Sequence, residues 1–308
     1  MSQSTDILYL GDVCGRNVVV PTTVHQSSLR MAESLSKTLG LAESESSMAS
    51  YWMLEVRKEQ WEHVAGMMSG AQLSSSRVLE IGCGLGLFVL VGNLLGFDCY
   101  GTEASASEYE GSVAMARELL HFGGISEERI SCGEGERLKY PDRTFDMVCS
   151  FQTLEHVNHP SRVLAEAFRV LAPQGKLFFT CPNYLYPYEA HYGLGLPLPL
   201  GRVFSEVVLK MRKRPTDYLR TIQWINPQRL RQWCIEAGFV DIDVNSIGVG
   251  LLPQKSLNIV PTTTLPYRFL RGDGEHASVE NFLRLPVIRT WARRHEVYPQ
   301  ISCCARRP

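Results

Sequence analysis

The sequence predicts an α/β fold: a doubly wound, mostly parallel sheet of seven strands, with an N-terminal helical extension and insertions after the fifth and sixth strands. Three observations lead to this prediction. From Val78 onward, short apolar runs alternate with helical segments, which is typical of βαβ units. The first of these runs ends in a glycine-rich turn. The 308 residues are 44% hydrophobic and 20% charged, as in ordinary globular proteins.

Residues 1–74 are expected to form an extension that ends in a helix. Residues 1–50 have no strong period, whereas residues 51–68 can form a helix with four large apolar side chains on one buried face. These side chains are Trp52, Val56, Trp61 and Val64. We expect residues 75–308 to form one domain with two insertions, at about 184–224 and 249–296.

Seven apolar runs are the candidate strands of this domain. They are residues 77–81, 98–102, 130–133, 145–151, 176–181, 239–247 and 298–305. Two of the helices between them have capping signals. Ser161 is expected to cap the helix after the fourth run, and Asn226, followed by Pro227, is expected to cap another.

The segment 78–86, VLEIGCGLG, joins the first run to a sharp turn that contains three glycines. Glycines permit such a turn and leave its backbone open to a ligand. A dinucleotide-binding G-x-G-x-x-G pattern would need glycine at the position of Leu87. The E-x-G-x-G-x-G pattern found here instead resembles motif I of the class I S-adenosylmethionine (SAM)-dependent methyltransferases, which have a Rossmann-like fold. The resemblance implies that the methionine end of SAM lies against Glu80, Gly82, Cys83, Gly84 and Gly86.

Residues after the next strands extend this candidate cofactor site. Glu103 lies 21 residues beyond Gly82, and a carboxylate there can accept hydrogen bonds from both hydroxyls of a ribose. The segment 132–150 resembles the adenine-binding segment of the same family. The resemblance implies that Glu134 and the amide of Gly135 face the adenine, and that Phe151 lies beside the adenosine.

The segment 150–160, SFQTLEHVNHP, resembles the post-strand segment of ubiquinone-type and other small-molecule methyltransferases. Some of those enzymes bind a divalent metal through a glutamate where this sequence has Gln152, so no metal is predicted. His156 and His191 are candidates for the base that takes a proton from an acceptor hydroxyl. Each histidine has an alternative structural role: His156 can cap its helix, and His191 can form hydrogen bonds within a lid.

These features favour a SAM-dependent methyltransferase that methylates an oxygen of a hydroxylated small molecule or sugar. A C-methyltransferase acting on a quinone or lipid and a NAD-dependent oxidoreductase of similar sheet topology are the alternatives. An aminopropyltransferase of the spermidine synthase type and a binding protein without turnover also stay open. The Asn/Asp-Pro-Pro-Tyr/Phe motif of enzymes that methylate amino groups of nucleic acids is missing, so DNA is not an expected partner.

Charge is unevenly distributed along the chain. Residues 201–308 hold 17 Lys+Arg and 9 Asp+Glu, although the whole chain holds 31 and 32. Residues 202–214 can form a helix with one apolar and one basic face. The apolar face has Val203, Phe204, Val207, Val208 and Met211, and the basic face has Arg202, Lys210, Arg212, Lys213 and Arg214. This helix is expected to be either a lid over the substrate or a surface for a membrane or an anionic, lipid-linked acceptor.

The cysteines and the N-terminus predict the compartment. Nine cysteines, an odd number without a C-x-x-C pair, argue against a disulfide framework or a structural metal. The first residues lack the basic and apolar regions of a signal peptide. We therefore expect a reducing, cytoplasmic location, and the sequence makes no prediction of the oligomeric state.

Overall fold

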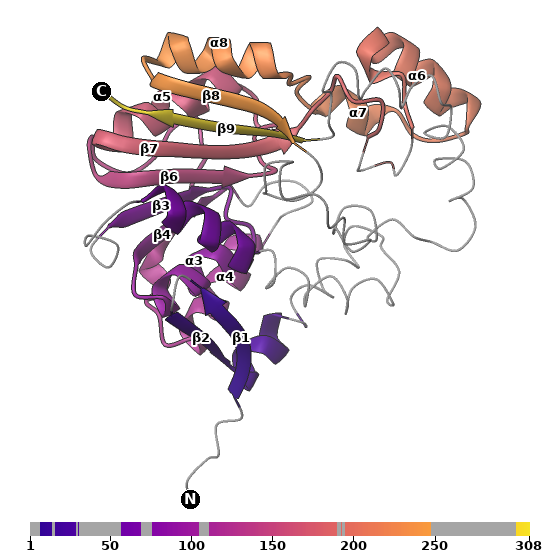
Figure 1. Cartoon of the computed structure of the whole chain (residues 1–308). Coiled ribbons are helices and arrows are strands. Elements are labelled where there is room, and N and C mark those ends of the chain that lie inside the picture. Colours follow the sequence, from indigo (N-terminus) through magenta and orange to yellow (C-terminus); the bar gives the residue numbers. More distant parts are fainter. Residues whose placement is uncertain are drawn as a thin grey trace, which may run out of the picture.

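The computed structural model describes residues 7–13, 16–28, 30, 57–68, 76–104, 111–189, 192, 195–247 and 300–308. Seven of its strands form one sheet (Figure 1). They are β3 (Arg77–Ile81), β4 (Asp98–Glu103), β5 (Ile130–Cys132), β6 (Phe145–Phe151), β7 (Leu171–Pro182), β8 (Val240–Ile247) and β9 (Gln300–Arg306).

The strand order in the sheet is β5-β4-β3-β6-β7-β9-β8. The first five of these are parallel to one another, and β9 is antiparallel to both β7 and β8. This confirms the predicted seven-stranded, mostly parallel sheet. The chain winds outward from β3 in both directions, so the order reverses between β3 and β6. Ligands of such sheets bind outside the carboxyl ends of the strands at this point.

Alternation along the strands buries both faces of the sheet. Val78, Met147 and Phe178 point into one apolar cluster, and their neighbours Leu79, Val148 and Phe179 point into another. Helices α3 (Leu87–Leu94) and α4 (Ser112–Phe122) cover the first face. Helices α5 (Pro160–Val170) and α8 (Pro227–Ala237) cover the second face (Figure 1). Because helices cover both faces, successive apolar residues of the central strands are buried on alternate sides of the sheet.

The helix at residues 57–67 is fixed to the first face by Trp61. The indole is fully buried, stacks on Phe88 with ring centroids 4.3 Å apart, and donates from Nε1 to the carbonyl oxygen of Phe88 at 2.8 Å. A Cβ at Gly92 would lie 2.1 Å from this ring, so α3 accepts the tryptophan because residue 92 is glycine. The predicted helix is confirmed over these residues, whereas Trp52 and Val56 lie outside the described residues.

An antiparallel hairpin precedes this helix and was not expected from the sequence. Its strands are β1 (Ile7–Val13) and β2 (Arg16–Pro21), and a short helix follows at residues 22–28. Val20 of β2 is buried in the apolar cluster that also contains Trp61. The hairpin therefore packs on the domain, although its residues show no strong period.

The capping predictions have different outcomes. The side chain of Asn226 accepts a hydrogen bond from the amide of Arg229 at 2.9 Å, which confirms it as the cap of α8. The prediction for Ser161 is wrong, because α5 begins at Pro160 and His159 is its N-cap residue, without a side-chain cap. Proline suits the first turn of a helix and starts α5 one residue earlier than expected.

The first insertion contains helices α6 (Arg202–Met211) and α7 (Asp217–Thr221), which lie beyond the carboxyl ends of β6 and β7 (Figure 1). The second predicted insertion, at about 249–296, lies outside the described residues. Within the part of the chain that the structure describes, no helix is both long enough and apolar enough to cross a bilayer.

Candidate functional site

The glycine turn after β3 is held by the neighbouring strand. The carbonyl oxygen of Thr102 accepts hydrogen bonds from the amides of Gly82, at 2.8 Å, and Cys83, at 3.1 Å. Gly82, Gly84 and Gly86 have φ values of +75°, +52° and +73°, which L-residues with side chains rarely adopt. The turn therefore depends on glycine at all three predicted positions.

The three glycines differ in what surrounds them. A Cβ at Gly82 would lie 2.3 Å from the side chain of Thr153, and one at Gly86 would lie 3.1 Å from Ala116. A Cβ at Gly84 would meet no described atom within 4 Å. Gly82 and Gly86 thus serve close packing, and the turn is open to a ligand at Gly84.

Glu103, the last residue of β4, reaches this opening. One of its carboxylate oxygens, Oε2, accepts a hydrogen bond from the amide of Gly84 at 2.7 Å. A carboxylate has two oxygens that accept in one plane, so it can bind ligand hydroxyls beside the turn. The structure brings together two residues that the sequence predicts for one site.

Glu80 lies beneath the turn and is 2% exposed. Its Oε1 is 3.8 Å from Nη1 of Arg57, and its Oε2 has no hydrogen-bond partner among the described residues. Burial raises the pKa of Glu80 to about 8, the charge of Arg57 lowers it, and Glu103 raises it further. A long ion pair does not replace the water that a carboxylate loses on burial. A cation bound near Oε2 would satisfy this carboxyl.

Arg57 comes from the helix at residues 57–67 and was not predicted as a site residue. Its guanidinium lies near Glu80 and over the ring of Phe151, 5.9 Å from the ring centroid. Burial lowers the pKa of Arg57, and the charge of Glu80 opposes this effect. Local sequence patterns carry no signal for this role, because Arg57 reaches the turn through the docking of its whole helix.

Cys83 and Phe151 contribute to the walls of the site. A Cβ at Gly101 would lie 2.7 Å from Sγ of Cys83, so the thiol is packed against β4. Burial raises the pKa of the Cys83 thiol well above its usual range, and the charges of Glu80 and Glu103 raise it further. The ring of Phe151 is buried beside Phe88, with centroids 5.1 Å apart. The thiol is thus neutral and packed, and the ring separates Arg57 from the core around α3.

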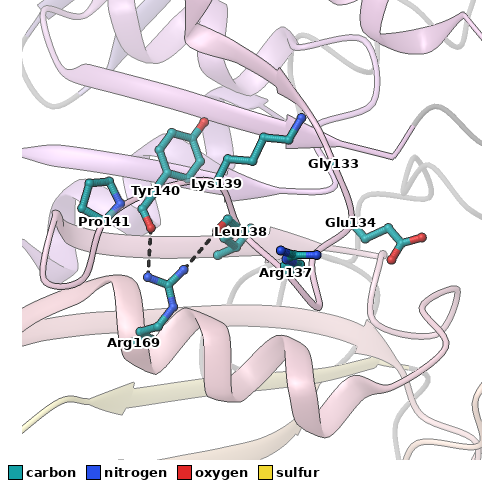
Figure 2. A pocket seen from close by; sticks show the side chains of 8 residues that line it. All are labelled: Gly133, Glu134, Arg137, Leu138, Lys139, Tyr140, Pro141 and Arg169. Carbon is teal, nitrogen blue, oxygen red and sulfur yellow. Dashed lines mark hydrogen bonds between the residues drawn. The ribbon is translucent and has the colours of Figure 1, made fainter.

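Glu134 and Gly135 follow β5. Gly135 is buried, and a Cβ there would lie 2.9 Å from Ile81, so this glycine lets the loop approach the end of β3. Glu134 is exposed and lines an open pocket of about 730 Å³ (Figure 2). The other lining residues are Gly133, Arg137, Leu138, Lys139, Tyr140, Pro141 and Arg169.

This pocket is distinct from the opening at Gly84. Arg169 donates to the carbonyl oxygens of Tyr140 at 2.9 Å and Leu138 at 3.1 Å, so its guanidinium shapes the pocket wall (Figure 2). Neither Gly84 nor Glu103 lines the pocket. The pocket is therefore not the space above the turn, although Gly133 at its edge donates from its amide to the carbonyl oxygen of Glu103 at 3.0 Å.

His156 lies between the loop after β6 and the first insertion. Its Nδ1 is 3.4 Å from the hydroxyl of Tyr218 on α7, and its Nε2 is 3.7 Å from Oε1 of Glu155. Glu155 is buried, and its carbonyl oxygen accepts from the amide of Gln223 at 2.7 Å. Both ring nitrogens of His156 therefore face protein groups. The other predicted base, His191, lies outside the described residues.

A family model described as a methyltransferase domain matches residues 53–244, more than half of the chain. The chain belongs to this methyltransferase family. It is a SAM-dependent methyltransferase with a Rossmann-like fold. Its cofactor is S-adenosylmethionine.

Curated relatives of this methyltransferase are ubiquinone biosynthesis O-methyltransferases. The one from Pseudomonas putida is 29% identical over 180 residues, which are 56% of this chain and 68% of that protein. The one from Nitrosococcus oceani is 31% identical over 175 residues, 54% of this chain and 65% of that protein. The mitochondrial one from Rattus norvegicus is 27% identical over 164 residues, which are 52% of this chain and 43% of that protein. The match thus spans about two thirds of the bacterial relatives and less than half of the rat protein.

Solved structures of SAM-dependent methyltransferases are also similar. The one from Thermotoga maritima has a TM-score of 0.48 at 17% identity, and the match covers 93% of this chain and 99% of that chain. The one from Mesorhizobium loti has a TM-score of 0.47 at 18% identity, covering 81% and 98%. The strand order described above assigns the fold without them.

The groups around the opening at Gly84 have the chemistry that the cofactor needs. SAM brings a ribose with two hydroxyls and an amino acid end with an ammonium and a carboxylate, and its sulfonium supplies an activated methyl group. The open space at Gly84 lies beside the carboxylate of Glu103, which suits a ribose. The buried Oε2 of Glu80 suits a cation, and Arg57 next to it suits an anion. The described residues include no group of three or more metal-ligating side chains.

Proposed function

We propose that this methyltransferase transfers the methyl group of SAM to a hydroxyl oxygen of a small molecule, a sugar or another hydroxylated metabolite. The observation that carries the methyl-transfer site is the contact of the Glu103 carboxylate with the open Gly84 amide at 2.7 Å. Oxygen as the acceptor atom is supported by the relatives, which are named O-methyltransferases.

The proposed cofactor contacts follow from the chemistry of each side chain. Glu103 binds the ribose hydroxyls, because its carboxylate lies at the open centre of the turn. The backbone from Gly82 to Gly86 borders the methionine part. Glu80 faces the ammonium and Arg57 the carboxylate of that part, since they are the buried carboxyl group and the neighbouring guanidinium beneath the turn. Glu134 and the amide of Gly135 border the adenine.

Methyl transfer needs the acceptor oxygen aligned with the methyl group and a base for the hydroxyl proton. We propose His156 or His191 as that base. For His156, the proton would be taken at Nδ1 once the hydroxyl of Tyr218 turns away from its position at 3.4 Å. Tyr192, which is buried with its ring centroid 6.1 Å from that of Tyr218, would help to exclude water from this side.

Calorimetry with S-adenosylhomocysteine tests the cofactor site. The wild-type protein is expected to bind this product, and Glu103→Gln to bind it at least tenfold more weakly, because a charge-assisted hydrogen bond contributes about 1.5–3 kcal/mol. Glu118→Gln, an exposed carboxylate on α4, is the matched control. Unchanged affinity in Glu103→Gln contradicts the proposed site, and NAD binding instead supports the oxidoreductase alternative.

A screen with methyl-labelled SAM identifies the acceptor class. Hydroxylated sugars, phenols and quinols are offered, and the product is analysed for the bond that carries the label. Label on oxygen is the expected result, whereas label on carbon supports the alternative of C-methylation of a quinone or lipid. We also propose a cytoplasmic location, which the free thiols of the eight described cysteines support.

A further inference from the structure

The outer side of α6 is an exposed apolar surface. Eight large hydrophobic side chains are exposed in the described part of the chain, and five of them lie on α6 or directly before it. We call these five residues the α6 surface: Leu200 is 66%, Val203 72%, Phe204 58%, Val207 50% and Met211 79% exposed. Contiguous exposed apolar side chains of this kind mark interaction sites on monomeric proteins.

The outward direction of this surface is fixed by the opposite side of the helix. Ser205 and Leu209 are fully buried, and at 100° per residue Val207 lies about 160° around the helix from each of them. Val208, which the sequence assigned to the apolar face, is half-buried and packs on the domain instead. The α6 surface is therefore not the side by which the helix packs on the described protein.

Two arginine contacts hold α6 in this orientation. Arg220 of α7 forms an ion pair with Glu206, with Nε 3.1 Å from Oε1. Arg202 donates to the carbonyl oxygen of Ile222 at 3.1 Å, and its guanidinium lies 5.4 Å from the ring centroid of Trp224. The helix is thus a fixed part of the insertion.

Basic side chains adjoin the apolar ones. Residues 200–214 contain five Lys and Arg and a single acid, Glu206, which is paired with Arg220. Lys210, Arg212, Lys213 and Arg214 are all exposed at the C-terminal end of α6. Apolar side chains bordered by cations match the interface of an anionic bilayer, where acyl chains lie just beneath negative headgroups.

We propose that the α6 surface, with the basic residues around it, docks the protein on an anionic membrane. The apolar side chains enter the headgroup region and the lysines and arginines contact the anionic lipids. α6 lies beyond the carboxyl ends of the parallel strands, on the same edge as the glycine turn (Figure 1). Where the proposed function holds, docking brings the acceptor side of the cleft to the bilayer and favours an acceptor with a lipid tail.

Flotation of the full chain with vesicles tests the proposal. The protein is mixed with phosphatidylcholine vesicles that contain or lack phosphatidylglycerol, at low and high salt. It is expected to float with the anionic vesicles, less at high salt, and not with the neutral ones. Phe204→Ser/Met211→Ser is expected to weaken binding about tenfold or more, because it removes two inserting apolar side chains. Ile235→Ser, which changes a 54% exposed residue of α8, is the matched control and should bind as the wild type does.

The charge contribution is tested separately. Lys210→Gln/Lys213→Gln is expected to lower binding about fivefold for each lysine removed, since a basic residue near an anionic surface contributes about 1 kcal/mol. Lys139→Gln/Arg162→Gln changes two exposed cations outside α6 and should leave binding unchanged. Calorimetry with S-adenosylhomocysteine on every variant shows that the fold is kept.

Flotation does not depend on methyl transfer, so it separates this proposal from the proposed function. Absence of binding to anionic vesicles overturns membrane docking, and so does binding that the α6 variants leave unchanged. Light scattering identifies the other occupant considered, a second copy of the chain. If the wild type does not float but forms a dimer, and Phe204→Ser/Met211→Ser dissociates that dimer, the surface serves self-association. This result also overturns the proposal.

Discussion

Replacing the buried carboxyl of Glu80 by an amide is expected to stabilise the ligand-free protein at alkaline pH. Glu80 is 2% exposed, one of its oxygens has no hydrogen-bond partner among the described residues, and the other is 3.8 Å from Arg57. Its charged form is therefore costly in the absence of a ligand. Glu80→Gln keeps the size of the side chain and removes the charge.

The sign and the size of the effect follow from the pKa. The pKa of Glu80 is about 8 in the folded protein against an ordinary 4.5, so the folded protein binds this proton more tightly than the unfolded chain does. Its contribution to stability is complete below pH 4.5 and is lost as the pH rises through about 8. At about 1.36 kcal/mol per pKa unit the loss is at most about 5 kcal/mol. We expect about half of this, because relaxation and water entry reduce the cost of a buried charge.

Urea unfolding of the ligand-free full chain at a series of pH values from acid to alkaline measures this contribution. The free energy of unfolding of the wild type is expected to fall between about pH 5 and pH 9 by about 2–3 kcal/mol more than that of Glu80→Gln. Glu118→Gln, exposed on α4, should follow the wild type. Equal pH dependence of wild type and Glu80→Gln would refute the reasoning. Lower stability of Glu80→Gln at pH 9 would also refute it, since the ion pair with Arg57 would then outweigh burial.

Three further predictions concern the cleft. Gly84→Ala is expected to cost about 1 kcal/mol of stability through its positive φ and to weaken S-adenosylhomocysteine binding at least tenfold. Gly82→Ala is expected to lower the Tm much further, because its Cβ would clash with the side chain of Thr153. Equal Tm values for the two variants would contradict this. Glu103→Gln is expected to lose affinity with little change in Tm, and a loss confined to Tm would assign Glu103 a purely structural role. Tyr218→Phe is expected to raise kcat/KM, because the hydroxyl that lies 3.4 Å from Nδ1 of His156 no longer has to leave before that nitrogen can accept the proton; an unchanged kcat/KM would argue against His156 as the base.

The core of the cofactor cleft is predictable from the sequence because it depends on local order. An apolar run, its last residues and the turn that follows fix where a strand ends, and parallel strands end at the same edge of a sheet. Glu103 and Gly84 are 19 residues apart, and the pairing of β3 with β4 is enough to bring the carboxylate to the amide. The parallel pairing of these two strands explains why both predicted residues meet.

Arg57 and the hairpin β1/β2 depend on contacts between distant parts of the chain, which a local pattern does not contain. Arg57 reaches Glu80 because Trp61 seats its helix against Gly92 and Phe88 on α3. The sequence indicates that this helix has a buried face but not which surface receives it. A tryptophan opposite a helical glycine is visible only once the two helices are placed together.

The same reasoning applies to α6, where periodicity identifies an apolar stripe without saying what covers it. Burial of a stripe against its own domain is the usual outcome for a helix in a globular protein. Here Leu209 and Ser205 are buried, and Phe204 and Met211 face outward. Exposed apolar area has an unfavourable hydration free energy, and the domain could reduce it by rotating the helix. Rotation would, however, bring the fully buried Leu209 and Ser205 into water and break the ion pair of Glu206 with Arg220, so the packing of the helix keeps the stripe outward.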